Sequence, residues 1–256
     1  MFTHAIVRKP GSNFAQGLTT VDLGVPSFEL VQQQHAEYCH ALRECGLSLI
    51  MLEEDPEHPD STFVEDTAVL TARSAILTRP GAPSRQGEVA AIRSSLRSFF
   101  PIVRQIEAPG TVDGGDICEA HGHFFIGLSQ RTNEEGAAQL AACLEAEGYS
   151  TSVIDVREMN SILHLKSGIA YIGKYTLVLM EEMAGNPLFS GYERIVVVHD
   201  ESYAANCVRV NDRVLVPAGC PRLASELSRR GFRLLELEMS EFRKMDGGLS
   251  CLSLRF

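Results

Sequence analysis

The sequence predicts an α/β fold in which about five copies of one small unit close around a common axis. Short apolar segments alternate with amphipathic helical segments along the 256 residues. The order strand, tight turn, strand, helix, strand recurs about every 45–50 residues, which is typical of closed arrays of blades. A doubly wound sheet, the main alternative, is disfavoured because the chain contains neither GxGxxG nor GxxxxGK[ST].

Four amphipathic segments are the expected helices. They cover Phe28–Cys45, Gly87–Phe100, Asn133–Glu147 and Arg222–Arg230. The residues expected to end them are Gly46, Pro101, Gly148 and Gly231. Asn133 is a suitable N-cap, and two glutamates follow it in the first turn, where negative charge favours a helix.

Short strands follow and precede these helices. The strands expected after a helix are Ser48–Leu52, Ile102–Ile106, Thr151–Ile154 and Arg233–Leu237. The paired strands expected before a helix are Ala68–Leu70 with Ala75–Thr78, Ile117–Ala120 with His123–Ile126, and Val208–Val210 with Arg213–Val216. Another copy fits less clearly, with strands Ala170–Ile172, Leu177–Leu179 and Ile195–Val198 and a weak helix before the last.

Composition excludes several classes of protein. The 33 acidic residues exceed the 23 basic ones, which argues against a surface that binds nucleic acid or an anionic membrane. No apolar run approaches the length of a membrane-spanning helix, and the first residues do not resemble a signal peptide. The seven cysteines are scattered and form no CxxC, so we expect free thiols in a reducing cytoplasm. We expect a single domain over residues 1–256.

Polar clusters stand just ahead of the predicted hairpins, at equivalent points of different repeats. They are Asp60–Asp66, Asp113–Asp116, His164–Ser167, Asn206–Cys207 and Asp246–Cys251. If the repeats close into a ring, these clusters meet at the axis and line one pocket. Considered singly, each has an ordinary explanation as a buried histidine, a solvated turn or a structural cysteine. His121 and His123 fall in a predicted hairpin turn without a third ligand, so we expect no metal.

The combination of cluster residues indicates covalent catalysis. A cysteine thiolate can attack an electrophile while a histidine transfers protons and a carboxylate orients the imidazole. Additional carboxylates suit an electrophile that arrives as a cation, because they accept paired hydrogen bonds from it. Cys251 and His164 are the candidates for the first two roles.

Six motifs, taken in this order, resemble those of dimethylarginine dimethylaminohydrolases. They are Phe63–Asp66, Thr78–Arg85, Leu128–Asn133, Leu163–Ser167, Ala204–Cys207 and Asp246–Cys251, and the resemblance covers nearly the whole chain. It implies a five-bladed α/β propeller with pseudo-fivefold ββαβ repeats around a central active-site pocket. It also implies hydrolysis of Nω-methylated arginines, a small cationic substrate, to citrulline and dimethylamine or methylamine, without a cofactor.

The resemblance also implies which residues form the site. The catalytic ones are Cys251 as nucleophile, His164 as general acid/base and Asp113 as the acid of the triad, where some family members have glutamate. Those expected to bind substrate are Glu65 and Asp66 at the guanidinium, Asp60 with the backbone carbonyls of Leu18 and Met245 at the α-amino group, and Arg85 and Arg131 at the α-carboxylate.

Other functions remain open at this stage. Arginine deiminases and amidinotransferases use the same triad logic, but they are typically longer. A cation-binding or ribosome-associated propeller would have no need of Cys251 and His164. The sequence leaves undecided the preference between dimethyl- and monomethylarginine, and also whether the chain forms a homodimer. The segment Gly17–Thr20 is either a lid over the pocket or a plain surface loop.

Overall fold

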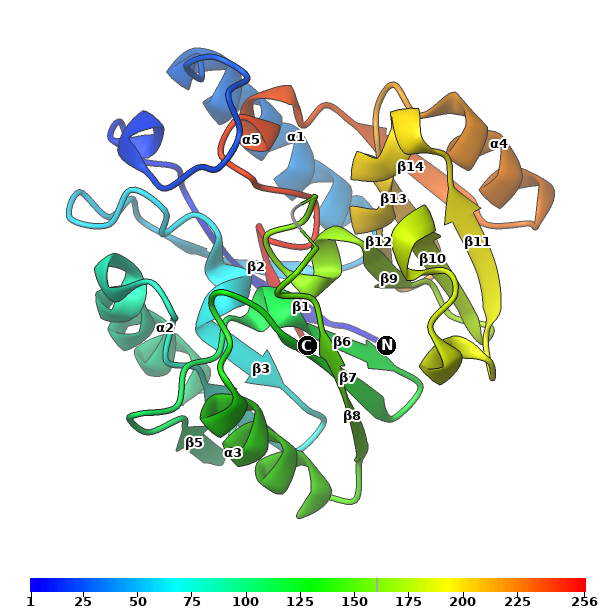
Figure 1. Ribbon diagram of the computed structural model, residues 1–256. Helices are drawn as coiled ribbons and strands as arrows, with labels where there is room; N and C mark the ends of the chain where they lie inside the picture. The colour runs from blue at the N-terminus through cyan, green and yellow to red at the C-terminus, as the bar shows by residue number, and fades with distance from the viewer. Residues whose placement is uncertain (160) are drawn as a thin grey trace.

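A computed structural model describes residues 1–159 and 161–256, and over these residues it contains five three-stranded sheets. Figure 1 shows the sheets arranged around a common centre, with α2, α3 and α4 towards the periphery. In every sheet the middle strand pairs antiparallel with one neighbour and parallel with the other. The prediction of a five-bladed α/β propeller is therefore confirmed.

Four blades have the predicted order of strands. Their strands are β3 (Ala68–Leu70), β4 (Ser74–Leu77) and β5 (Ile102–Gln105); β6 (Ile117–Ala120), β7 (His123–Leu128) and β8 (Ser150–Asp155); β9 (Ile169–Tyr171), β10 (Thr176–Met180) and β11 (Glu193–Val197); and β12 (Val208–Val210), β13 (Arg213–Pro217) and β14 (Arg233–Leu237). Tight turns join the antiparallel pairs. The parallel pairs need a crossover segment, since the chain must return to the same end of the sheet.

The remaining blade joins the two ends of the chain. Strand β1 (His4–Arg8) lies between β2 (Ser48–Leu52), which is parallel to it, and β15 (Leu254–Arg255), which is antiparallel. Sequence analysis identified β2 but missed β1 and β15, because no turn links strands that stand at opposite ends of the sequence. The marked N- and C-termini lie near the centre in Figure 1.

Three helices occur as predicted, within a few residues at their ends, and one is shorter. The three are α1 (Phe28–Glu44), α3 (Glu134–Glu145) and α4 (Pro221–Arg229). Asn133 caps α3 through its side chain, which accepts a hydrogen bond from the Gly136 N–H at 2.8 Å. The helix expected over Gly87–Phe100 is limited to α2 (Val89–Leu96), preceded by the 3₁₀ segment η3 (Pro83–Glu88). The chain leaves the helix before Pro101, which disfavours helical backbone in the residue ahead of it.

The weak helix expected between β10 and β11 is wrong. Two separate 3₁₀ turns, η6 (Glu181–Met183) and η7 (Pro187–Phe189), occupy this connection. Pro187 cannot donate a backbone hydrogen bond, and the Asn186 side chain instead accepts one from the Leu188 N–H at 3.0 Å. The local polar bonds therefore compete successfully with a continuous helix.

Four short turns lead into the first strands of the four blades and position the site. They are η2 (Val64–Thr67), η4 (Gly114–Asp116), η5 (Leu165–Ser167) and η8 (His199–Asn206), and each packs against the next around the axis. The remaining helical segments are η1 (Phe14–Gln16) and α5 (Ser240–Arg243). Among the helices of residues 1–159 and 161–256, none is both long and apolar enough to cross a membrane.

Candidate active site

The five polar clusters meet at the axis, as the ring closure requires. A small cavity of about 30 Å³ lies among them. Eight of the ten predicted site residues line it: Leu18, Asp60, Asp66, Arg85, Arg131, His164, Met245 and Cys251. The other two, Glu65 and Asp113, are buried outside its wall.

Asp113 holds the imidazole of His164. The His164 Nε2 and Asp113 Oδ2 atoms are 3.0 Å apart, and the aspartate side chain is fully buried. The second carboxylate oxygen accepts a hydrogen bond from the Gly81 N–H at 2.8 Å. Both oxygens of Asp113 are thus engaged, and this fixes the plane in which the imidazole can bind.

Asp66 is the carboxylate on the cavity wall whose charge acts most strongly on His164. Its Oδ2 accepts a hydrogen bond from Arg85 Nη1 at 2.6 Å, and its Oδ1 accepts one from the Gly115 N–H at 2.8 Å. Burial opposes ionisation, but the charges of His164 and Arg85 and these hydrogen bonds lower the pKa of Asp66 to about 2. Asp66 is therefore a carboxylate at neutral pH.

Gly115 allows the close approach of Asp66 and His164. A Cβ atom at this position would lie 2.8 Å from Asp66 Oδ1 and 2.9 Å from the His164 ring. Contacts this short exclude a side chain, so the glycine of the Asp113–Asp116 cluster is required by packing.

Cys251 and His164 both hold their protons more tightly than the free side chains do. Burial and the charges of Glu65 and Asp66 raise the pKa of the Cys251 thiol to about 12. Burial would lower the pKa of His164, but the charges of Asp66 and Asp116 and the bond with Asp113 raise it to about 9. Without a ligand, the cavity at neutral pH therefore holds a neutral thiol beside an imidazolium.

Asp116 is a site residue whose role the sequence did not indicate. Its Oδ2 accepts hydrogen bonds from Ser129 Oγ and Thr132 Oγ1, both at 2.6 Å, and its Oδ1 accepts one from the Leu165 N–H at 2.9 Å. The carboxylate thereby joins the η4 turn to the residue that follows His164. The presence of Ser129 and Thr132 in one of the six motifs was the available signal.

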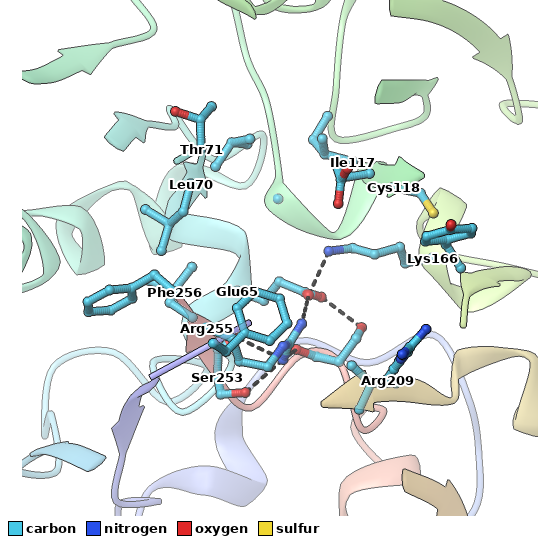
Figure 2. A pocket seen from close by; sticks show the side chains of 18 of the residues that line it. Glu65, Leu70, Thr71, Ile117, Cys118, Lys166, Arg209, Ser253, Arg255 and Phe256 are labelled. Atoms are coloured by element: carbon cyan, nitrogen blue, oxygen red, sulfur yellow. Dashed lines mark hydrogen bonds and ion pairs between the residues drawn. The ribbon is translucent and has the colours of Figure 1, made fainter. Parts of the chain in front are cut away.

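Glu65 is not among the residues that line the small cavity. Its carboxylate binds Lys166 Nζ at 2.6 Å, Ser250 Oγ at 2.8 Å and Arg255 Nη2 at 3.2 Å. Figure 2 shows Glu65, Lys166 and Arg255 in a second, larger cavity of about 1060 Å³, which Ser250 also lines. Glu65 and Asp66 are consecutive in a 3₁₀ turn, where successive side chains are rotated by a third of a turn, so they face different cavities.

Arg85 and Arg131 were predicted to bind the α-carboxylate of the substrate. Arg85 lines the small cavity but is already bound to Asp66 and, through Nε and Nη2, to Glu88 at 3.0 and 2.9 Å. Arg131 lies close enough to Asp60 for its charge to favour the ionised carboxylate, although burial raises the pKa of Asp60. Both arginines line the small cavity.

The segment that contains Leu18 covers the cavity from outside. The Leu18 N–H donates to Asp60 Oδ1 at 3.0 Å, and the Thr20 N–H donates to Asp246 Oδ2 at 2.6 Å. Asp246 also lines the cavity, and its φ of +57° is a conformation that aspartate tolerates better than most residues. Two aspartates of the site thus hold this segment through its backbone.

One group of side chains could in principle hold a metal ion. Among residues 1–159 and 161–256, potential ligand atoms of Asp66, Asp113 and His164 all lie within 4.8 Å of one another. These atoms already bind Arg85, Gly115, Gly81 and each other, an arrangement suited to holding and moving a proton. The expectation that the protein needs no metal or cofactor stays a prediction.

Comparison with known proteins identifies relatives over the whole chain. The family model described as "N,N dimethylarginine dimethylhydrolase, eukaryotic" matches residues 27–207. The N(G),N(G)-dimethylarginine dimethylaminohydrolase of Pseudomonas aeruginosa is 46% identical over the full length of both chains. The Streptomyces coelicolor protein of the same name is 32% identical and covers 98% of this chain and 96% of its own.

Solved structures give the same result. A cysteine-to-serine variant of the P. aeruginosa enzyme in complex with citrulline superimposes with a TM-score of 0.97 at 46% identity, covering all of both chains. The N-terminal domain of ArgZ, an arginine dihydrolase, shares the fold with a TM-score of 0.87 at 18% identity, covering 100% of this chain and 97% of its own. By sequence and by structure, this chain belongs to the dimethylarginine dimethylaminohydrolase family.

Proposed function

We propose that this protein hydrolyses Nω-methylated arginines, asymmetric dimethylarginine and monomethylarginine, to citrulline and dimethylamine or methylamine. The observation that carries the proposal is the small cavity, which combines the Cys251 thiol, the His164–Asp113 pair and the ionised Asp66. Relatives support the same activity, since the P. aeruginosa enzyme has been crystallised with citrulline. A related structure is an adduct with S-methyl-L-thiocitrulline.

The guanidinium of the substrate is expected to bind at Asp66. Asp66 lines the small cavity as a carboxylate, and this supports the assignment because a carboxylate can accept hydrogen bonds from a guanidinium. At the other end, Asp60 with the carbonyls of Leu18 and Met245 would hold the α-amino group, and Arg85 with Arg131 would hold the α-carboxylate. We assign Glu65 an indirect part in guanidinium binding, because its carboxylate faces the larger cavity.

The first half-reaction forms a covalent intermediate. The Cys251 thiol loses its proton to solvent when the cationic substrate binds, and its sulfur attacks the guanidinium carbon. The His164 imidazolium gives its proton to the departing dimethylamine as the C–N bond breaks. A thiouronium cation remains on Cys251, beside a neutral His164, and the adjacent carboxylates stabilise the positive charge.

The second half-reaction releases citrulline. Neutral His164 takes a proton from a water molecule, and the resulting hydroxide adds to the thiouronium carbon. The C–S bond then breaks, the hydroxyl group of the adduct becomes the carbonyl of citrulline, and its proton returns to the sulfur. The site is thereby restored to a thiol and an imidazolium.

This mechanism requires the substrate to generate the thiolate. The pKa of about 12 leaves Cys251 protonated at neutral pH in the empty site. A cation bound at Asp66 would offset the negative charges that raise this pKa. Ultraviolet titration of the thiolate, with and without a non-reactive guanidinium ligand, measures the effect. An identical thiol pKa in both titrations would contradict the proposed order of events.

A product assay tests the function. We expect citrulline and dimethylamine from asymmetric dimethylarginine, and no turnover by Cys251→Ser or His164→Ala, with substrate binding retained by the serine variant. Ammonia released from arginine at a higher kcat/KM would instead identify an arginine deiminase. Binding without turnover by the wild-type protein would favour the non-catalytic alternative.

We further propose that the activity resides in a single catalytic domain of residues 1–256, which acts as a homodimer in a reducing cytoplasm. All seven cysteines are free, which agrees with a reducing compartment. Apolar side chains on the outer strands, such as Val153 and Val196, are nearly half exposed and offer surface for self-association. Sedimentation velocity would distinguish a dimer from a monomer.

A further inference from the structure

We propose that Asn206 is a positioning residue that fixes the turn carrying Cys251 against the segment carrying His164. The inference rests on the proposed function and concerns the same site. Asn206 belongs to the one polar cluster that the proposed mechanism does not use. Its side chain is buried and does not line the small cavity, so it acts on the reaction through other residues.

The amide of Asn206 binds both catalytic segments at once. Its Nδ2 donates to the backbone carbonyl of Lys166 at 2.7 Å and to Ser250 Oγ at 3.0 Å. Its Oδ1 accepts a hydrogen bond from the Ser250 N–H at 3.0 Å. Ser250 precedes the nucleophile, and Lys166 stands two residues after the general acid/base. One side chain therefore joins two segments that are far apart in the sequence.

Glu65 extends this connection to the segment that carries Asp66. Ser250 Oγ, which accepts from Asn206, donates to Glu65 Oε2 at 2.8 Å, and Glu65 Oε1 pairs with Lys166 Nζ at 2.6 Å. The Glu65 N–H also donates to the Cys251 carbonyl at 3.1 Å. These bonds form a closed polar network behind the small cavity, and Figure 2 shows its Glu65–Lys166 pair.

Gly248 couples the same amide to the thiol. A Cβ atom on Gly248 would lie 2.3 Å from Asn206 Oδ1, so the two residues are in direct contact. The Gly248 N–H donates to Cys251 Sγ at 3.4 Å, and this bond lowers the pKa of the thiol. Displacement of the Asn206 amide would therefore disturb both the position of the sulfur and its hydrogen bond.

The network predicts a defect in kcat with little change in KM. In Asn206→Ala the Ser250 N–H, Ser250 Oγ and Lys166 carbonyl lose their partner, and the Cys251 turn can move relative to His164. A displacement of this kind reduces kcat by roughly 10- to 100-fold. The residues that hold the substrate belong to the small cavity, so KM for dimethylarginine should change by less than about threefold.

Two further variants separate the parts of the network. Asn206→Asp keeps the oxygen that accepts from Ser250 but places a second acceptor oxygen against the Lys166 carbonyl, so we expect a kcat loss at least as large as that of Asn206→Ala. Gly248→Ala should reproduce the loss caused by Asn206→Ala, because the new methyl group displaces the amide. If both substitutions act through the same contact, the double variant should be no worse than either single one.

The matched control is Cys207→Ala, a buried neighbour of Asn206 that lies outside the network. Thermal unfolding of each variant measures the general loss of stability. The pH dependence of Cys251 alkylation by iodoacetamide, followed by peptide mass spectrometry, should shift upward in Asn206→Ala and stay unchanged in Cys207→Ala. A kcat for Asn206→Ala within twofold of wild type, or equal kcat losses in both variants, would overturn the proposal.

Failure of the proposed function would be visible separately. If the wild-type protein forms no citrulline, the function is wrong, whereas the alkylation profiles still report on the position of Cys251. If the wild type is active and the Asn206 variants match it in kcat and alkylation, the positioning role alone is rejected.

Discussion

Two cavities lie at the axis, and the smaller one contains the more reactive side chains. The larger, of about 1060 Å³, contains charged groups that already satisfy one another, such as Glu65 with Lys166 and Arg255. The smaller, of about 30 Å³, has Cys251, His164 and Asp66 on its wall, with pKa values far from their ordinary ranges. Volume alone would select the larger cavity, whereas the shifted pKa values favour the smaller one, to which the proposed mechanism assigns the reaction.

The same short segments supply both cavities. Asp66, His164 and Cys251 face the small cavity, while Glu65, Lys166 and Ser250 face the large one. Neighbouring residues therefore have different proposed roles: those in the small cavity contact the substrate, and those in the large cavity support them. The following predictions test this division.

The largest effect is expected from Asp113→Asn, on the small-cavity side. An amide cannot stabilise the imidazolium as a carboxylate does, so kcat should fall roughly 10³-fold while KM changes little. Steady-state kinetics with dimethylarginine would measure this. The matched variant Glu119→Gln, in the wall of the large cavity, should retain wild-type kinetics. Equal losses in the two variants would remove the distinction between the cavities.

The next largest effect is the pH dependence of the free energy of unfolding that we expect from His164. Folding raises the pKa of His164 from 6.5 to about 9, so the protonated imidazole stabilises the folded protein. Its contribution to the free energy of unfolding is complete below pH 6.5 and is lost as the pH rises towards 9. The difference between these pKa values corresponds to about 3 kcal/mol. Urea unfolding from pH 6 to 9 should show the decline in wild type and a flatter profile in His164→Gln. Parallel profiles would show that His164 is not the group responsible.

A smaller effect is expected from Glu65→Gln, at the boundary between the cavities. Loss of its charge leaves Lys166 and Arg255 without their partner, which should lower the free energy of unfolding by about 2 kcal/mol. It should also lower the thiol pKa, since Glu65 raises it, and reduce kcat by roughly tenfold through movement of Cys251. A selective rise in KM would instead indicate that Glu65 binds the guanidinium directly.

The smallest effect is expected from Cys118→Ala in the large cavity. The side chain is buried and lines the large cavity, not the small one that contains His164, so we expect it to take no part in the reaction. We expect kcat/KM within twofold of wild type and a stability loss of about 1 kcal/mol from the missing sulfur atom. Activity assays and denaturant unfolding would measure the two quantities, and a large loss of activity would assign the large cavity a direct catalytic role.

Most of the fold could be predicted because its signals are local. The hairpins, the N-cap Asn133 and the glycines after the helices act within a few residues of themselves. The errors occurred where local signals were weak or in competition. Strands β1 and β15 have no shared turn, and the connection between β10 and β11 is divided by Asn186 and Pro187.

The candidate site was predicted less completely. Motif resemblance indicated eight of the residues that line the small cavity, and it also assigned to the substrate Glu65, which lines the large one. It also gave no role to Asp116 or Asn206, whose partners stand far away in the sequence. Spacing along the chain does not reveal such bonds, because they depend on how five separate segments are oriented when the ring closes.

The sequence by itself predicted the repeating unit, about five copies of it and the motifs that belong at the axis. Periodicity and turn residues act over short distances, so they need no knowledge of the closed ring. Only the tertiary structure decided which cavity each polar side chain faces and which charges become neighbours. The elevated pKa values of Cys251 and His164 follow from that arrangement, because burial and neighbouring carboxylates exist only once the blades have closed around the axis.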